Sequence, residues 1–62
     1  MIVKTSEGNV TGSKKVLNYI SMLASKASEN YYARGLDALG ESAQTFADEI
    51  YDALRICGYY DD

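Results

Sequence analysis

An apolar repeat in the C-terminal half of the sequence constrains the fold more than any other feature. Seven apolar or small residues recur there at alternating spacings of three and four, the period of one face of a helix that packs on another helix. Ala47 and Leu54 widen this face to the breadth that a helix needs in a globular core. The pattern predicts a helix over residues 36–57, a stop at Gly58 and a tail over residues 58–62. The seven residues are Leu36, Leu39, Ala43, Phe46, Ile50, Ala53 and Cys57.

The start of this helix is less sharply indicated. Asp37 is a residue type that caps helices, whereas Gly40 weakens a helix interior by about 1 kcal/mol relative to alanine. The helix is therefore expected to begin at Asp37, or as late as Glu41 or Ser42.

A second apolar repeat predicts another helix over residues 13–34. Ser13 is the expected N-cap, and Gly35 suits the position that follows the last turn. The face predicted to be polar carries Asn18, Ser21 and Ser25. The residues of the predicted apolar face are Val16, Ile20, Leu23, Ala27 and Tyr31.

Residues 1–12 differ in kind from the helical segments. Two β-prone runs, one over residues 2–5 and one at Val10 and Thr11, flank a turn-rich stretch over residues 6–9. This pattern predicts a short β-hairpin or an extended arm. An isolated hairpin is only marginally stable in water, so a hairpin here is expected to pack on the helices or on another chain.

The predicted elements make residues 1–62 a single small domain of mainly α class, an antiparallel helical hairpin with an N-terminal β-hairpin or arm. A chain of 62 residues buries a thin core, and a single cysteine cannot form a disulfide within it. The outer sides of both apolar faces stay uncovered in one helical hairpin. We therefore expect two copies to complete a four-helix bundle as a homodimer.

The sequence argues against an enzyme. It contains no histidine, and its one cysteine, Cys57, falls on the predicted apolar face, where it is expected to be buried and unreactive. One cysteine with scattered carboxylates does not make a zinc site of the usual kind. We expect no catalytic residues, no metal and no cofactor.

The two halves of the chain carry opposite charge. Residues 1–34 contain five basic and two acidic residues, and residues 35–62 contain one basic and seven acidic residues, which together give the net charge of −3. An acidic chain without a concentrated basic surface is not expected to bind nucleic acid directly. No apolar run is long enough for a transmembrane helix, so no membrane association is expected either.

The acidic residues are expected to form a ladder on the outside of the second helix. Residues three or four apart share one side of a helix, so Asp37, Glu41, Asp48 and Asp52 line up, with Glu49 beside them. Tyrosines gather nearby, and tyrosine is common in protein interfaces. The residues predicted to bind a partner are Asp37, Glu41, Asp48, Glu49, Asp52, Tyr51, Tyr59, Tyr60, Asp61 and Asp62.

Two functional interpretations follow. In the first, the protein is a small acidic inhibitor or adaptor that binds the basic surface of a nucleic-acid-handling protein, as DNA mimics and phage-encoded proteins of the anti-CRISPR type do. In the second, it is a structural or regulatory helical homodimer whose charges serve assembly and solubility. The lone thiol and the lack of a secretion signal favour the cytoplasm, that of the host cell if a phage encodes the chain. A continuous, unpaired acidic face favours the inhibitor; neutralisation by Lys14, Lys15, Lys26 and Arg34 favours the dimer.

Overall fold

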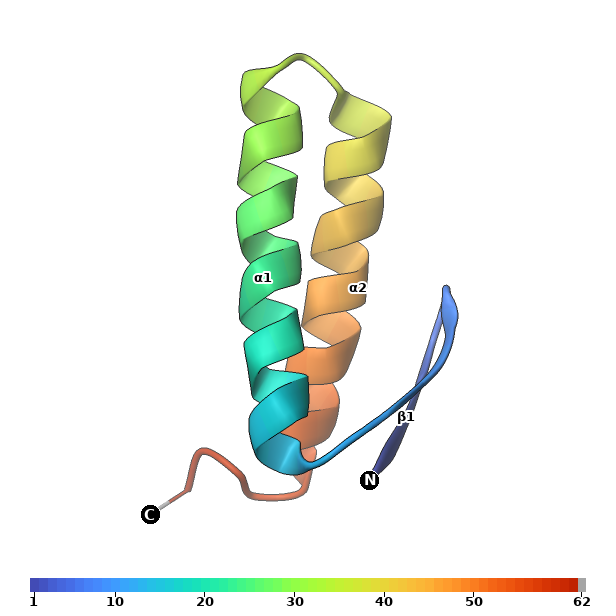
Figure 1. Cartoon of the computed structure of the whole chain (residues 1–62), viewed down its shortest axis with the longest axis vertical. Helices are drawn as coiled ribbons and strands as arrows, with labels where there is room; N and C mark the ends of the chain where they lie inside the picture. Colours follow the sequence, from blue (N-terminus) through green and yellow to red (C-terminus); the bar gives the residue numbers. More distant parts are fainter. Residues whose placement is uncertain (62) are drawn as a thin grey trace.

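The computed structural model describes residues 1–61 and is mainly helical, with a two-stranded antiparallel hairpin at the N-terminus (Figure 1). The two helices run antiparallel side by side, and the hairpin lies next to the second helix (Figure 1). This architecture confirms the predicted class and resolves the N-terminal segment as a hairpin. The elements are β1 (Ile2–Thr5), β2 (Gly8–Thr11), α1 (Lys14–Ala33) and α2 (Asp37–Ile56).

Local signals at the helix ends act as the sequence predicted. Ser13 caps α1, because its hydroxyl accepts a hydrogen bond from the amide of Val16 at 3.2 Å. At the other end Gly35 has a φ of 77°, the left-handed conformation that glycine adopts most readily. The amide of Leu36 then donates to the carbonyl of Tyr31 at 2.9 Å, which closes a Schellman motif and turns the chain into α2.

The start of α2 differs from the expectation in two respects. Its N-cap is Leu36, and Asp37 makes no capping hydrogen bond but lies inside the first turn, where its negative charge suits the helix dipole. The helix also begins before Gly40, whose amide donates to the carbonyl of Leu36 at 2.9 Å. The expected late start at Glu41 or Ser42 is therefore wrong, because packing against α1 outweighs the low helix propensity of one glycine.

Gly40 lies where the helices approach closely. A Cβ atom placed on Gly40 would meet three ring carbons of Tyr32 at 3.0 Å. The buried hydroxyl of Ser28 donates to the carbonyl of Gly40 at 2.7 Å, which joins the two helices directly. Small residues thus make up much of the line along which the two helices touch, here called the contact line. Ser21 and Ser28 are buried on α1, and Gly40 and Ala47 are buried on α2.

This contact line corrects the predicted faces of α1. Leu17, Ser21 and Ser28 are its buried residues, whereas Val16 and Leu23 of the predicted apolar face are exposed. Ser21 was placed on the polar side and is buried instead. Serine is small enough to let two helices approach, and its hydroxyl here donates to the carbonyl of Asn18 at 2.8 Å, so burial leaves it satisfied.

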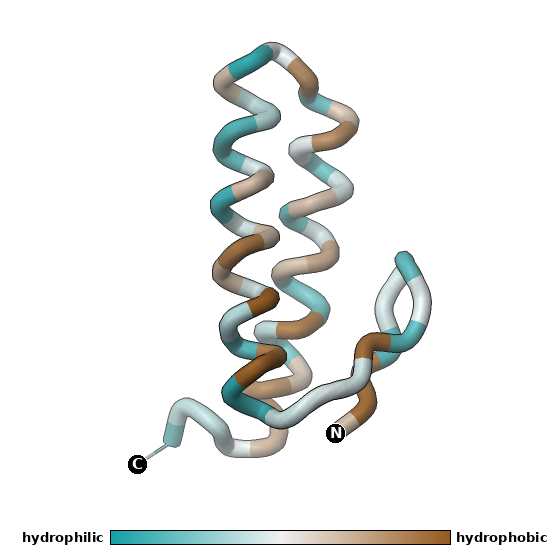
Figure 2. The backbone as a smooth tube through the Cα atoms, in the orientation of Figure 1, coloured by the Kyte–Doolittle hydropathy of each residue, from teal (hydrophilic) through white to brown (hydrophobic). Residues whose placement is uncertain are grey.

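The hairpin supplies part of the core. Val3 pairs with Val10 across the strands and packs against a buried cluster of Leu17, Ile50 and Leu54. In α1 the more hydrophobic stretch lies in the half nearest this cluster (Figure 2). The hairpin therefore covers the part of the helical surface that lies over this cluster. Val10, Ile20, Phe46, Ala53 and Tyr59 are half-buried around the cluster.

Cys57 is exposed, which contradicts its predicted burial. The helix ends just before it, because Gly58 has a φ of 83° and the amide of Tyr59 donates to the carbonyl of Leu54 at 3.0 Å. Cys57 is thus the C-cap of α2 and not a member of its packed face. Phe46 is half-buried, so Ile50 and not Phe46 lies at the centre of the core.

Neither α1 nor α2, within residues 1–61, combines the length and apolar character that crossing a membrane requires.

Adjacent residues of α1 test this packing. Leu17→Ala removes a side chain with no exposed surface and should lower the free energy of unfolding by about 2–5 kcal/mol. Val16→Ala, at a position 49% exposed, should cost less than about 1 kcal/mol. Urea denaturation followed by circular dichroism measures both values. A larger loss of stability for Val16→Ala than for Leu17→Ala would show that Val16 belongs to the packed face of α1, as predicted from the sequence.

Candidate protein-interaction site

Four acidic residues of α2 lie exposed along its length, as the helical spacing predicted: Asp37, Glu41, Asp48 and Asp52. At about 100° per residue, Asp48 and Asp52 each lie about 200° around the helix from the buried Ile50. The acidic ladder, as we call these four residues, therefore occupies a side of α2 well removed from that of Ile50.

The ladder is not neutralised by the basic residues of the N-terminal half. Within residues 1–61 the structure contains one ion pair, between Arg55 and Asp52 of the same helix, at 3.5 Å. Both side chains are about 60% exposed, so the pair contributes little to stability. None of the remaining bases of that part of the chain approaches an acidic group closely enough to pair with it. Those residues are Lys4, Lys14, Lys15, Lys26 and Arg34.

Glu49 was predicted beside the ladder, and the structure shows it bound within the fold instead. Its carboxylate accepts two hydrogen bonds from Ser6, one from the amide and one from the hydroxyl, each 2.8 Å long. Ser6 lies in the turn between β1 and β2, so Glu49 fastens the hairpin to α2. This contact spans 43 positions of the sequence, and no local pattern in the sequence indicates it.

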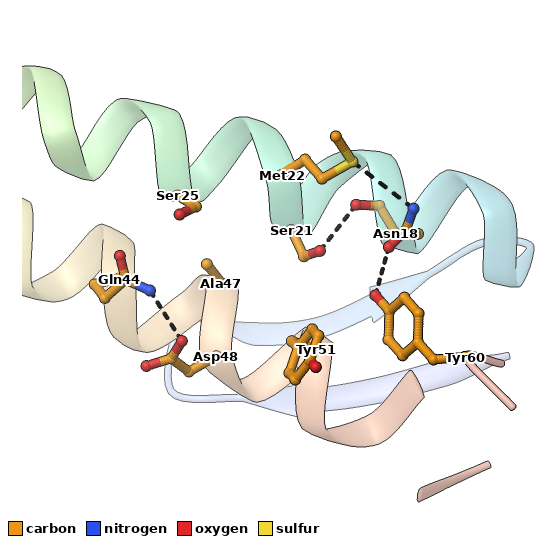
Figure 3. Close-up of a pocket in the computed structure, with 9 residues that line it drawn as sticks. All are labelled: Asn18, Ser21, Met22, Ser25, Gln44, Ala47, Asp48, Tyr51 and Tyr60. Atoms are coloured by element: carbon orange, nitrogen blue, oxygen red, sulfur yellow. Dashed lines mark hydrogen bonds between the residues drawn. The ribbon is translucent and has the colours of Figure 1, made fainter. Parts of the chain in front are cut away.

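A groove runs between α1 and α2 on the side away from the β-hairpin (Figure 3). Its volume is about 430 Å³. Two predicted residues of α2, Asp48 and Tyr51, line it together with Tyr60 of the tail. The other six lining residues were not predicted from the sequence to form a site. They are Asn18, Ser21, Met22, Ser25, Gln44 and Ala47.

Short side chains of α1 could have indicated this groove. Ser21, Ser25 and Ser28 recur at spacings of four and three, the period of one helix face. Where such residues face a second helix, they bring the backbones together and leave a shallow channel beside the contact line.

The tail closes one end of the groove. The ring of Tyr60 lies 5.0 Å from that of Tyr51, centroid to centroid, with the two planes tilted by 30°. Its hydroxyl donates to the side-chain oxygen of Asn18 and so links the tail to α1 (Figure 3). Desolvation, with a smaller contribution from the neighbouring Tyr51, raises the pKa of Tyr60 above its ordinary value of 10.0. The phenol therefore remains a neutral donor across the physiological range.

The remaining predicted residues of the tail have different surroundings. Tyr59 is half-buried, packs on the core cluster and meets Tyr60 edge-on, with the ring centroids 5.2 Å apart. It therefore anchors the tail and is not part of the groove. Asp61 is exposed, and Asp62 lies outside the described residues.

A second, more apolar groove lies on the side of the helices where the hairpin packs. Its volume is about 370 Å³, and it begins beyond Glu7 of the hairpin turn. It is thus the part of the helical surface that the hairpin does not cover. Its apolar lining comes from Ala24, Ala27, Tyr31, Leu39, Ala43 and Phe46.

Comparison of the chain with protein-family models, with curated proteins and with solved structures found no match.

The contact between Glu49 and Ser6 gives a prediction about local stability. Glu49→Ala should free the hairpin turn, because hydrogen bonds to a charged group contribute about 1.5–3 kcal/mol and less where water reaches them. The amide of Ser6 should then exchange its hydrogen about tenfold faster in an NMR experiment, since about 1.4 kcal/mol corresponds to tenfold. Glu41→Ala, at an exposed residue of the same helix, is the control and should leave that rate unchanged. Equal rates in the wild type and Glu49→Ala would show that the contact does not hold the turn.

Proposed function

We propose that the protein is a non-enzymatic binding protein whose acidic ladder engages a basic surface on a partner protein. The observation that carries the proposal is that the ladder is exposed and that, within residues 1–61, only Asp52 of the ladder makes an ion pair. Had the charge split served only assembly within the chain, the basic residues of α1 would be expected to lie against the ladder. Within the part of the chain that the structure describes, they make no ion pair with it.

The chemistry of the ladder favours a partner that handles nucleic acid. From Asp37 to Asp52 the ladder extends about 22 Å, at 1.5 Å per residue. Duplex DNA presents one charge per about 1.7 Å, or about thirteen over this length, whereas the ladder presents four. Charge alone therefore imitates a phosphate backbone only in part, and shape and aromatic contacts must add to the binding. A positively charged channel such as that of an RNA-guided nuclease offers the required surface.

In this role the protein is a small inhibitor or adaptor that competes with nucleic acid for a basic groove. It does not itself bind nucleic acid, and it acts in the cytoplasm, that of the host if a phage encodes it. Proteins of the anti-CRISPR type are the class that this combination of size and charge resembles.

Charge reversal tests the ladder. Once a partner has been captured from cell extract and purified, Asp48→Lys/Asp52→Lys should weaken its binding more than tenfold without unfolding the protein, because both side chains are exposed. Added salt and competing nucleic acid should weaken the wild-type complex. Binding by surface plasmon resonance measures each effect.

The matched control is Glu7→Lys/Glu29→Lys, which changes the net charge equally at acidic residues outside the ladder. It should weaken binding far less than the ladder variant. Equal losses of affinity for the two variants would mean that the net charge of the protein, and not the ladder, attracts the partner. If Asp48→Lys/Asp52→Lys bound the partner with wild-type affinity, and if salt did not change that affinity, the ladder would be only a solvated surface.

A second candidate function is a structural or regulatory homodimer. The observation that favours it is the apolar groove beside the hairpin, together with Leu23, which is 57% exposed near it. A second copy that packs on this groove would complete the four-helix arrangement expected from the sequence. The acidic ladder lies on another side of α2, so such a dimer leaves the ladder accessible.

Sedimentation decides whether the dimer exists. The protein should sediment as a dimer at micromolar concentration, and Leu39→Glu should make it monomeric, because a buried unpaired carboxylate opposes association. Ile56→Glu is the control, at a residue 80% exposed on the opposite end of α2, and should remain dimeric. A wild-type monomer under these conditions excludes the homodimer.

A further inference from the structure

We propose that the groove between α1 and α2 binds an arginine side chain of the partner protein. This inference rests on the proposed function, because Asp48 belongs both to the acidic ladder and to the wall of the groove. It adds a specific contact to what would otherwise be a general attraction between charges.

The hydrogen bonds within the groove leave a charged acceptor open. The hydroxyl of Ser21 donates to the carbonyl of Asn18 at 2.8 Å, and the amide of Gln44 donates to Asp48 at 2.9 Å. The hydroxyl of Tyr60 is engaged with Asn18 (Figure 3). Ser21, Gln44 and Tyr60 thus direct donors at the wall itself, whereas the hydroxyls of Ser25 and Tyr51 make no hydrogen bond within residues 1–61. Within the same residues the carboxylate of Asp48 keeps a second oxygen without a hydrogen-bond donor.

The electrostatics of the groove call for a cation. Asp48 is the one charged group among its nine lining residues, and Asp52 lies one turn farther along α2. A carboxylate in a groove attracts an ammonium or a guanidinium more strongly than the same group on a convex surface, because its walls exclude part of the solvent.

The aromatic walls select arginine over lysine. Tyr51 is 47% exposed and Tyr60 is 39% exposed, so each leaves part of its ring open to a ligand. A guanidinium is planar, stacks on a tyrosine face and reaches a carboxylate through two parallel N–H groups, whereas an ammonium offers a compact point charge. Asp48 and Tyr51, three residues apart on α2, provide the carboxylate and the ring on the same side of the helix.

The groove is large enough for this ligand, and its walls position the binding groups. A volume of about 430 Å³ lies within the range of about 300–1,000 Å³ typical of small-molecule sites. Gln44 orients the carboxylate of Asp48, and Asn18 fixes the ring of Tyr60 through its hydroxyl. Little conformational freedom is therefore lost by the walls on binding. Arginines that contact phosphates in a basic channel are the residues a partner would present.

Titration of the ¹⁵N-labelled protein with hexa-arginine and with hexalysine tests the proposal by NMR. Hexa-arginine should bind about threefold or more tightly than hexalysine and should shift the amides of Asn18, Met22 and Tyr51. Tyr51→Leu should remove this preference, because cation–π contacts at exposed sites are worth a few-fold in affinity. Asp48→Asn should weaken hexa-arginine binding more than Asp37→Asn does. Glu29→Gln, outside both the groove and the ladder, should leave the binding unchanged.

The outcomes separate the groove from the ladder. Equal affinity for the two peptides, with equal losses for Asp48→Asn and Asp37→Asn, would overturn the arginine site and leave the acidic ladder as the binding surface. The arginine site would also be overturned if hexa-arginine bound selectively but shifted only amides outside the groove. Binding of neither peptide at low salt would count against the ladder and the groove together.

Discussion

A hydrogen bond from the hydroxyl of Ser28 to the carbonyl of Gly40 joins the two helices directly, and the ring of Tyr32 packs against the same glycine. The close approach needs small residues on both sides, and Ser21 and Ala47 continue the contact line. Larger apolar side chains are thereby displaced toward the hairpin side, where Val3 completes the core. On the other side the same short residues leave a groove. The close approach of the two helices at these small residues thus leaves large apolar side chains on one side and a groove on the other.

The elements of the fold could be predicted because their signals are local. A serine that precedes a helix and a glycine that ends it act within a few residues, and Ser13, Gly35 and Gly58 do so here. The packed face of α1 could not be predicted from hydrophobicity alone. Periodicity assigned Val16 to the core, whereas the neighbouring Leu17 is buried. Whether a serine is buried depends on the residue that faces it, and the partner of Ser28 lies on a different helix, 12 positions away.

The candidate site likewise has features that could be predicted from the sequence and features that could not. The exposure of the acidic ladder follows from helical spacing, because four carboxylates on one side of α2 are unfavourable to bury. The role of Glu49 does not follow, since its partner in the hairpin turn is remote in sequence. Nor does the groove, which depends on the path of the chain after Gly58 and on the contact between Tyr60 and Asn18. The sequence therefore indicates the charge of the ladder, whereas the groove beside it is formed only when the helices and the tail pack together.

The fastening of the hairpin turn by Glu49 also has a consequence for the order of folding. The contact from Ser28 to Gly40 closes a loop of 12 positions around the link at Gly35, whereas the contact from Ser6 to Glu49 closes a loop of 43 positions. Loop closure over longer distances costs more entropy, so the helical pair is expected to form before the hairpin docks. In the native protein the hairpin is likewise expected to detach before the two helices separate. Its departure would expose Val3 and the core beneath it while both helices remain paired. The hairpin is therefore expected to behave as a cooperative unit with its own opening equilibrium.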